Sequence, residues 1–243
     1  MTTTRPIATP AQEKSVFIQR LFTAIAPRYD WFNRLASFNL DQGWRRRAVA
    51  ASALQPGMRV LDVCTGSGDL ALMCAGSQAA GQGTVVGLDF NDAMLHTASF
   101  KSQGLELPVW WIRGDAQRLP FESQRFDRVF IGFSTRNLSH LETGLREMFR
   151  VLKSGGRLVI LETGRPPNPV VRAVYFAALF TVARVVGWLV TGRLWPFTYL
   201  ARSVKGFLRP EEMVELLAGC GARAWYQPLS WGIASLYVAD KPA

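Results

Sequence analysis

The sequence predicts an α/β fold, in which helices cover both faces of a mostly parallel central sheet. Three observations support this prediction. Patterns typical of strands and helices alternate between residues 59 and 162. The strand segments 129–131 and 158–161 are apolar at every position, as in strands buried on both faces of a parallel sheet. The chain has 243 residues, of which 49% are hydrophobic, and this is enough for one large domain with a substantial core.

The N-terminal region is expected to be a flexible tail over residues 1–14, followed by a helical cap over residues 15–54. Apolar residues recur every three or four positions between residues 16 and 26, which indicates an amphipathic helix. This helix ends before Pro27, because the residue that precedes a proline disfavours helical backbone. A second short helix is expected over residues 41–53.

The alternating elements follow in order along the chain. Strands are expected over residues 59–64, 84–89, 107–113, 126–133 and 156–162. Helices are expected over residues 70–75, 93–103 and 141–152. A last helix over residues 210–219 precedes two late strands, over residues 223–227 and 235–239.

Residues 165–204 interrupt this alternation. The uncharged run over residues 173–183 has 11 residues and ends at Arg184. At about 1.5 Å per residue it is too short to cross a hydrocarbon core of about 30 Å, so no transmembrane span is expected. Two interpretations remain: a hydrophobic helical lid packed on the sheet, or a helix that lies at a membrane interface.

Charge and cysteine content bound the function. The net charge is +10 and the mean hydropathy is slightly positive, a combination that favours a membrane surface over nucleic acid as the partner. Three cysteines in no zinc-binding pattern indicate a reducing, cytoplasmic compartment, and no secretory signal is expected. With only two histidines, a metal site is not expected.

The segment over residues 60–70 reads as a buried strand, a glycine turn and the start of a helix. Gly66 and Gly68 allow a ligand to approach the backbone, and the following helix offers unpaired N–H groups to an anionic group. The triple-glycine dinucleotide fingerprint is absent, because Thr65 or Cys64 stands at its first position. This favours S-adenosylmethionine (SAM) over a nicotinamide cofactor, with a plain strand-to-helix turn as the alternative.

Two acidic residues follow the next two strands. Asp89 stands 23 residues after Gly66, where a carboxylate accepts hydrogen bonds from both ribose hydroxyls of a bound adenosine. Asp115 is placed to accept from an adenine amino group, while Ala116 leaves room for the ring. The alternatives are a helix cap for Asp89 and an ordinary acidic turn for Asp115.

With these motifs the chain resembles the class I SAM-dependent methyltransferases, and specifically the ubiquinone/menaquinone-biosynthesis C-methyltransferases. The glycine turn is typical of the whole superfamily, whereas the segments Tyr29-Asp30 and Arg136-Asn137 are much more specific to the quinone group. The similarity covers roughly residues 16–239. Its further matches are Phe22, Ala26-Pro27-Arg28, Asn33, Trp44-Arg45-Arg46, Gly87-Leu88-Asp89-Phe90, Gly114-Asp115-Ala116, Leu119-Pro120-Phe121, Arg150-Val151-Leu152-Lys153 and Leu161-Glu162.

The resemblance implies a Rossmann-like methyltransferase fold and two groups of site residues. The SAM site is expected to comprise Asp62, Gly66, Ser67, Gly68, Asp89, Asp115, Ala116 and Gly132. The catalytic candidates near the methyl acceptor are Tyr29, Asp30, Arg136 and Asn137.

Four departures from the family pattern lie on the acceptor side. Gly132 stands where the family usually has a serine, Phe197 where it has a tyrosine, and Arg202 where it has an acidic residue. After the fifth strand, Thr163-Gly164-Arg165-Pro166 stands where the family has an aromatic residue, a small residue and Lys-Pro. At Gly132 either one side-chain contact to the cofactor is lost or backbone replaces it.

The activity implied by the resemblance is methyl transfer from SAM to a ring carbon of a polyprenylated quinol, demethylmenaquinol being favoured. The ring carbon is nucleophilic only when a phenol with a pKa near ~10 loses its proton. Tyr29, Asp30, Asn137 and Glu162 are the candidates to carry that proton, and Arg136 is the candidate to stabilise the phenolate. The structural alternatives are a lid tyrosine at Tyr29 and an ion pair with a nearby acid at Arg136.

The expected location is the cytoplasm, peripherally on the inner face of the membrane. The lid would cover the prenyl tail, and Arg45-Arg46-Arg47 would attract anionic lipid by about 1 kcal/mol per basic residue, unless they form a solvated helix face. A homodimer is also considered, and nucleic acid is not expected as a partner. Two other functions stay open: a methyltransferase for another small aromatic or lipid-like acceptor, and a non-catalytic SAM- or lipid-binding assembly protein of the quinone pathway.

Overall fold

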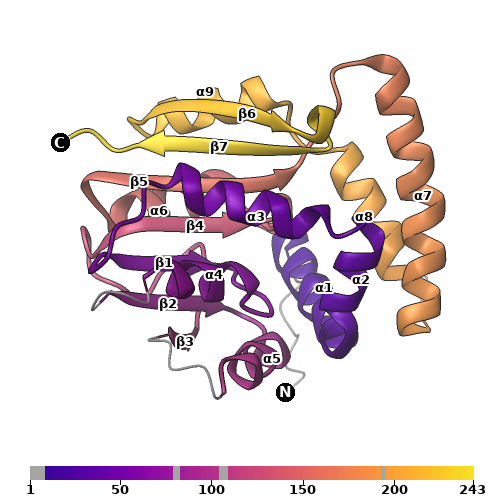
Figure 1. The fold of residues 1–243 in the computed structure, drawn as a ribbon, viewed down its shortest axis with the longest axis horizontal. Helices are drawn as coiled ribbons and strands as arrows, with labels where there is room; N and C mark the ends of the chain where they lie inside the picture. Colours follow the sequence, from indigo (N-terminus) through magenta and orange to yellow (C-terminus); the bar gives the residue numbers. More distant parts are fainter. Residues whose placement is uncertain (1–8, 79–82, 104–108, 193–194) are drawn as a thin grey trace, which may run out of the picture.

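A seven-stranded sheet forms the centre of the molecule (Figure 1). The computed structural model describes residues 9–78, 83–103, 109–192 and 195–243. The strand order is β3-β2-β1-β4-β5-β7-β6, in which β1 to β5 run parallel and β7 pairs antiparallel with β5 and β6. The strands are β1 (Arg59–Val63), β2 (Thr84–Asp89), β3 (Val109–Arg113), β4 (Phe126–Gly132), β5 (Leu152–Thr163), β6 (Arg223–Leu229) and β7 (Ala234–Asp240). The predicted α/β class is confirmed.

Helices cover both faces of the sheet. Buried side chains of α3 and α4 pack on one face, and those of α6 and α9 pack on the other. Adjacent residues of β5 serve the two layers, because Leu158 packs toward α6 and Val159 toward α3 and α4, and both are fully buried. The helices are α1 (Pro10–Ile25), α2 (Tyr29–Ala36), α3 (Leu40–Ala51), α4 (Asp69–Ser77), α5 (Asp92–Ser102), α6 (Leu141–Val151), α7 (Pro169–Thr191), α8 (Trp195–Lys205) and α9 (Pro210–Gly219).

The helices α1, α2, α7 and α8 gather beyond the carboxyl ends of the parallel strands, at the right of Figure 1. They share a third apolar cluster, in which Leu21, Ile25 and Phe32 of the N-terminal region pack with Leu179 of α7 and Leu200 of α8. In doubly wound sheets, ligands bind where the strand order reverses, which here is between β1 and β4. The helical cover therefore lies over the place where a ligand is expected.

The N-terminal region differs from the expectation in two ways. Helix α1 begins at Pro10 rather than at residue 16, so the predicted tail does not extend over residues 10–14. Its start is fixed by a capping box, in which Thr9 and Gln12 each bond the backbone of the other. Helix α2 was not expected as a separate element. It is a short α-helix of eight residues that follows a 3-10 turn over Ala26–Arg28.

Helix α7 is longer than the uncharged run that ends at Arg184. The helix continues through this residue, whose side chain is exposed, and reaches 23 residues. Its segment Pro169–Val190 is long and apolar enough to cross a membrane by length and composition, and only 6% of its most apolar stretch is buried in the protein. The uncharged run alone underestimated its length, because an arginine on a solvent-facing position does not break a helix.

Arg45, Arg46 and Arg47 were expected to form one basic surface patch, and this prediction is wrong for Arg45. Arg45 is buried on the inner face of α3, whereas Arg46 and Arg47 are exposed. The other elements lie close to their expected bounds; the main change is that α6 ends at Val151 and β5 begins at Leu152. The expected start of the third strand, at residues 107 and 108, lies outside the described residues.

Candidate active site

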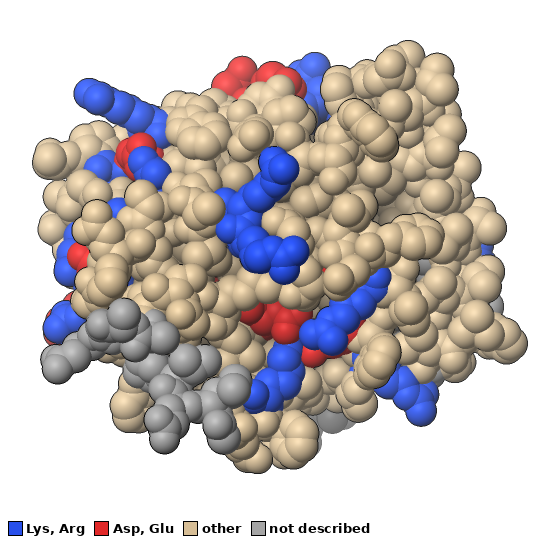
Figure 2. All heavy atoms as spheres, in the orientation of Figure 1, with Lys and Arg blue, Asp and Glu red and all other residues tan. Residues whose placement is uncertain are grey.

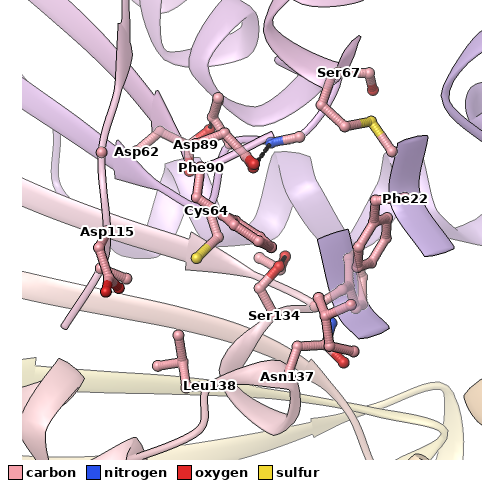
Figure 3. Close-up of a pocket in the computed structure, with 18 of the residues that line it drawn as sticks. Phe22, Asp62, Cys64, Ser67, Asp89, Phe90, Asp115, Ser134, Asn137 and Leu138 are labelled. Atoms are coloured by element: carbon pink, nitrogen blue, oxygen red, sulfur yellow. Dashed lines mark hydrogen bonds between the residues drawn. The ribbon is translucent and has the colours of Figure 1, made fainter. Parts of the chain in front are cut away.

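A cavity of about 550 Å³ opens at the carboxyl ends of the parallel strands. We call it the strand-end cavity, and the loops after β1, β2, β3 and β4 all contribute to its walls. Figure 3 shows Asp62, Asp89 and Asp115 on one side of it and Phe22 and Asn137 on the other. The predicted SAM-site residues that line it are Asp62, Gly66, Ser67, Asp89, Asp115, Ala116 and Gly132.

The glycine turn is held by one carboxylate. The N–H of Gly66 donates to Asp89 at 2.8 Å, drawn as a dashed line in Figure 3, and Gly66 has φ +57° with open space where a side chain would stand. Gly68 has φ +82° and lies under Trp111, whose ring would be 2.5 Å from an added Cβ atom. Gly68 does not line the cavity. The structure shows its place in the turn and its close packing, and the predicted ligand contact of Gly68 stays a prediction.

Asp89 and Asp62 are buried acids in the wall of this cavity. Asp89 accepts from the backbone N–H groups of Gly66 and Asn91, and burial raises its pKa to about 6. Asp62 accepts from Thr65 at 2.5 Å and from the N–H of Ala71 at 3.1 Å, and burial raises its pKa to about 7. Its second oxygen, Oδ1, has no hydrogen-bond partner among the described residues. A buried acceptor without a donor fits a ligand that brings N–H or O–H groups, as SAM does.

The other predicted SAM contacts differ in how firmly they are held. Asp115 accepts from the backbone N–H of Gln117 at 2.9 Å, and Ala116 is buried beside it. Ser67 donates to Asp30. At Gly132 an added Cβ atom would meet Leu70 at 3.4 Å, an ordinary contact, so the glycine in place of the family's serine is not a steric requirement.

A second cavity, of about 500 Å³, lies under the helical cover, and we call it the lid cavity. Its walls come mostly from apolar side chains of α1, α2, α3, α7 and α8. It shares one wall with the strand-end cavity, made of Phe22, Tyr29, Arg45, Phe133 and Asn137. The two cavities, one lined by both polar and apolar side chains and one with a largely apolar lining, are therefore direct neighbours.

Tyr29, Asn137 and Arg136 are brought together at the lid cavity. Tyr29 and Asn137 lie in the shared wall, where burial raises the pKa of Tyr29 and where Asn137 accepts from Tyr199 at 3.2 Å. Arg136 forms an ion pair with Glu162, as the structural alternative foresaw, and both side chains are buried. Its Nε atom is buried and has no acceptor among the described residues. One donor of Arg136 is thus left for a ligand oxygen.

Asp30 is not brought together with these residues. It lines neither cavity, and its carboxylate accepts from Lys101 at 2.7 Å and from Ser67. Lys101 also pairs with Asp69, so this network ties α2 to α5 and to the start of α4. Asp30 thus helps to hold the cover over the strand-end cavity.

Sequence reasoning missed Asp41 as a site residue and misassigned Arg45. These residues form a buried ion pair within α3, and the Arg45 guanidinium lies 5.3 Å from the centre of the Phe133 ring. Tyr175 and Tyr199 of the lid helices also reach the lid cavity. Of the two acceptor-side departures in α8, Arg202 is exposed, and the side chain of Phe197 lies outside the described residues.

The sequence model of the ubiE/COQ5 methyltransferase family matches residues 9–241. The chain belongs to this family. Relatives of similar length agree with the assignment. A demethylmenaquinone methyltransferase from Deinococcus radiodurans is 40% identical over 98% of both chains. One from Thermus thermophilus is 41% identical over 91% of this chain and 100% of its own. A ubiquinone/menaquinone biosynthesis C-methyltransferase UbiE from Ectopseudomonas mendocina is 35% identical over 96% and 92%.

Solved structures share the fold of this methyltransferase. A SAM-dependent methyltransferase from Thermotoga maritima superposes with a TM-score of 0.64, at 16% identity and over 92% of this chain and 99% of its own. One from Aquifex aeolicus has a TM-score of 0.60, at 19% identity and over 81% and 88%. The chain is therefore a SAM-dependent methyltransferase with a Rossmann-like fold.

The buried acid Asp62 makes the stability of the unliganded methyltransferase depend on pH. Its pKa is about 7 in the folded protein and near 3.8 when unfolded, so the folded state binds the proton more tightly. This contribution favours folding at low pH and is lost as the pH rises from about 4 to 7. We expect Asp62→Asn to remove the effect, shifting the unfolding free energy in favour of the variant by about 2–3 kcal/mol between pH 5 and pH 7.5. Urea unfolding of both proteins at both pH values measures this, and a pH-independent difference would contradict it.

Proposed function

We propose that this enzyme transfers the methyl group of SAM to a ring carbon of a polyprenylated quinol in menaquinone or ubiquinone biosynthesis, with demethylmenaquinol as the preferred acceptor. The observation that carries the proposal is the wall shared by the strand-end and lid cavities. Methyl transfer requires donor and acceptor to meet in line, and positioning supplies much of the acceleration. The names of the relatives support the choice of a quinol.

In this assignment SAM occupies the strand-end cavity and supplies a methyl group bonded to a positively charged sulfur. Asp89 binds the ribose hydroxyls and at the same time fixes the turn at Gly66. The unpartnered oxygen of Asp62 accepts from a ligand donor. Asp115 and Ala116 bind the adenine end.

The quinol head group occupies the lid cavity. The free Nε–H of Arg136 donates to one ring oxygen, because this buried donor otherwise lacks an acceptor. A fixed guanidinium is effective there, since it stabilises negative charge on a phenol most strongly where water is excluded. Tyr29 and Asn137 in the shared wall orient the ring toward the donor.

The prenyl tail lies along α7. Val170, Val174, Ala178 and Val182 line the lid cavity at intervals of four residues, so they form one apolar stripe of the helix. The valines of this stripe are exposed to solvent at their outer sides. A tail along this stripe would cover apolar surface that the protein leaves open.

We also propose that the mouth of the lid cavity docks on the inner, cytoplasmic face of the membrane. Phe38 and Trp231 line this cavity and are each 80% exposed. Both stand at left-handed backbone positions, with φ +51° and +57°, which costs about 1–3 kcal/mol per residue and persists only where the surroundings hold it. Figure 2 shows basic side chains gathered over α3 in the centre of the view, beside a mostly uncharged protein surface over α7. Exposed Arg46 and Arg47 of α3 fit an anionic surface.

The membrane assignment is tested by sedimentation with anionic vesicles. We expect Phe38→Ser and Trp231→Ser to weaken binding about tenfold each, because each removes an aromatic side chain worth about 1.5–3 kcal/mol when buried in lipid. Phe100→Ser and Trp110→Ser are matched controls, since these side chains are 68% and 66% exposed but line neither cavity. Equal losses in all four variants, or binding of the wild type that salt does not weaken, would contradict the proposed docking face.

The proposed reaction is tested with purified enzyme, labelled SAM and two acceptors. We expect label to enter demethylmenaquinol in detergent micelles and not to enter a water-soluble phenol of similar acidity. Labelling of the soluble phenol alone would assign the enzyme to another acceptor. SAM binding without turnover of either would indicate the non-catalytic assembly function.

A further inference from the structure

The lid cavity contains a buried acid–base pair that none of the roles above uses. Asp41 carries the one carboxylate among the described residues that line this cavity. It forms an ion pair with Arg45, and the two side chains are only 5% and 9% exposed. Asp41 also accepts from Ser37 at 2.9 Å and from Gln42 at 3.2 Å. Arg45 is in addition part of the wall shared with the strand-end cavity.

The other candidate bases fail on position or on protonation. Asp30 lines neither cavity and is paired with Lys101. Glu162 lines neither cavity, is fully buried, and accepts from Thr135, Arg136 and Thr163.

The tyrosines of the lid cavity are weak candidates for a different reason. Burial raises the pKa of Tyr29 and Tyr199, and it raises the pKa of Tyr175 to about 12. These phenols therefore keep their protons at neutral pH. An imidazole is not available in this cavity, since neither His96 nor His140 is among the described residues that line it.

We propose that Asp41 is the general base that removes the phenol proton of the acceptor, and that Arg45 stabilises the phenolate that forms. The inference rests on the proposed quinol acceptor. Before the proton moves, the buried guanidinium faces the Asp41 carboxylate; afterwards it faces the phenolate, while Asp41 is neutral. The number of buried charges stays the same, so the step avoids the several kcal/mol that an unpaired buried charge would cost. Arg136 cannot make this exchange, because Glu162 has no access to the cavity.

The step balances as follows. The phenol O–H bond breaks and its proton goes to Asp41. A C–C bond forms between the ring carbon and the methyl carbon as the bond from that methyl carbon to sulfur breaks. The oxygen then takes back the proton from Asp41, and the ring carbon loses its hydrogen to water as a proton. The net products are methylated quinol, S-adenosylhomocysteine and one proton.

Several charged or titratable groups surround Asp41 and enter the pH profile. They are Arg45 on its own helix, Tyr29 from α2, Arg136 from the turn after β4, Tyr175 from α7, Tyr199 from α8 and, through Gln42, Asp69 from α4. For this reason a pH profile alone is not decisive, and the acidity of the substrate is varied as well.

The test compares wild type and Asp41→Asn with two quinol analogues, one with an ordinary phenol and one made acidic by electron-withdrawing groups so that it is ionised at pH 8. We expect kcat of the variant to fall about 10²–10³-fold with the ordinary phenol, since a positioned base contributes 10²–10⁴-fold. With the ionised analogue we expect a loss below tenfold. With the ordinary phenol, the rate of the variant should rise tenfold per pH unit up to the pKa of the substrate, whereas that of the wild type levels off.

Equal losses with both analogues would overturn the base assignment and leave Asp41 a structural role. If the wild type methylates neither analogue, the proposed function itself fails, so the two failures are distinguishable. Asp127→Asn is the matched control. Asp127 is also an ion-paired acid, with Lys153 as its partner, but it lines neither cavity. The kcat of this control should stay within twofold of the wild type. If Asp41→Asn does not fold, Asp41→Glu keeps the charge but displaces the base, and its loss should again be confined to the ordinary phenol.

Discussion

Asp89→Ala is expected to abolish measurable SAM binding while the fold is kept. One oxygen of this carboxylate fixes the turn at Gly66 and the other fixes Asn91, so the substitution removes both the proposed ribose acceptor and the support of the turn. A hydrogen bond to a charged group contributes about 1.5–3 kcal/mol, and the loss of two weakens binding by about 10²–10⁴-fold. Burial raises the pKa of Asp89 to about 6, so the ionised side chain destabilises the unliganded protein at neutral pH, and the substitution removes this cost. The variant should therefore still fold and unfold cooperatively.

Titration calorimetry of wild type and Asp89→Ala with SAM measures this loss. Asp115→Ala is the comparison, because its carboxylate bonds only its own turn, and we expect a loss of about tenfold. Binding to the wild type should also weaken below about pH 6, where Asp89 takes up a proton and can no longer accept two hydrogen bonds as an anion. Unchanged affinity in Asp89→Ala would remove the SAM site from this cavity.

Arg136→Met is expected to destabilise the protein by about 3–5 kcal/mol and to reduce methyl transfer to background. Glu162 is completely buried, and without its guanidinium partner it becomes an unpaired charge in the core. The same substitution removes the cation that we propose binds a ring oxygen of the acceptor. Stability is measured by urea unfolding and activity with labelled SAM.

The double variant Arg136→Met/Glu162→Gln separates the two effects. With both charges gone, most of the lost stability should return, because replacing a whole buried pair is far less costly than breaking it. Activity should not return. A double variant that is both stable and active would show that this ion pair is structural only.

The gathering of the candidate SAM-site residues in one cavity was predictable because these residues follow consecutive parallel strands. The carboxyl ends of β1, β2 and β3 meet at one edge of the sheet, so Gly66, Asp89 and Asp115 come together once the strands are recognised. The strands themselves were recognisable because their apolar runs serve two faces, as Leu158 and Val159 do.

The acceptor side was predictable only in part, because it depends on how separate helices dock. Asp30 meets Lys101, which lies 71 residues away, and no local pattern announces that pair. Asp41 at the start of a helix has the pattern of an ordinary surface residue, and only the packing of α3 against the sheet, α4 and α2 turns it and Arg45 inward. Likewise, α7 contacts α2 and α8 and extends beyond the uncharged run, so the limits of that run did not give its length.

The quinone content of cells that lack this protein tests the central claim most directly. Lipid extracts analysed by mass spectrometry should contain a quinone lighter by one methyl group in place of the mature form, and the wild-type gene should restore the mature quinone. The Asp89→Ala gene should not restore it. A deletion strain with an unchanged quinone profile would contradict the account.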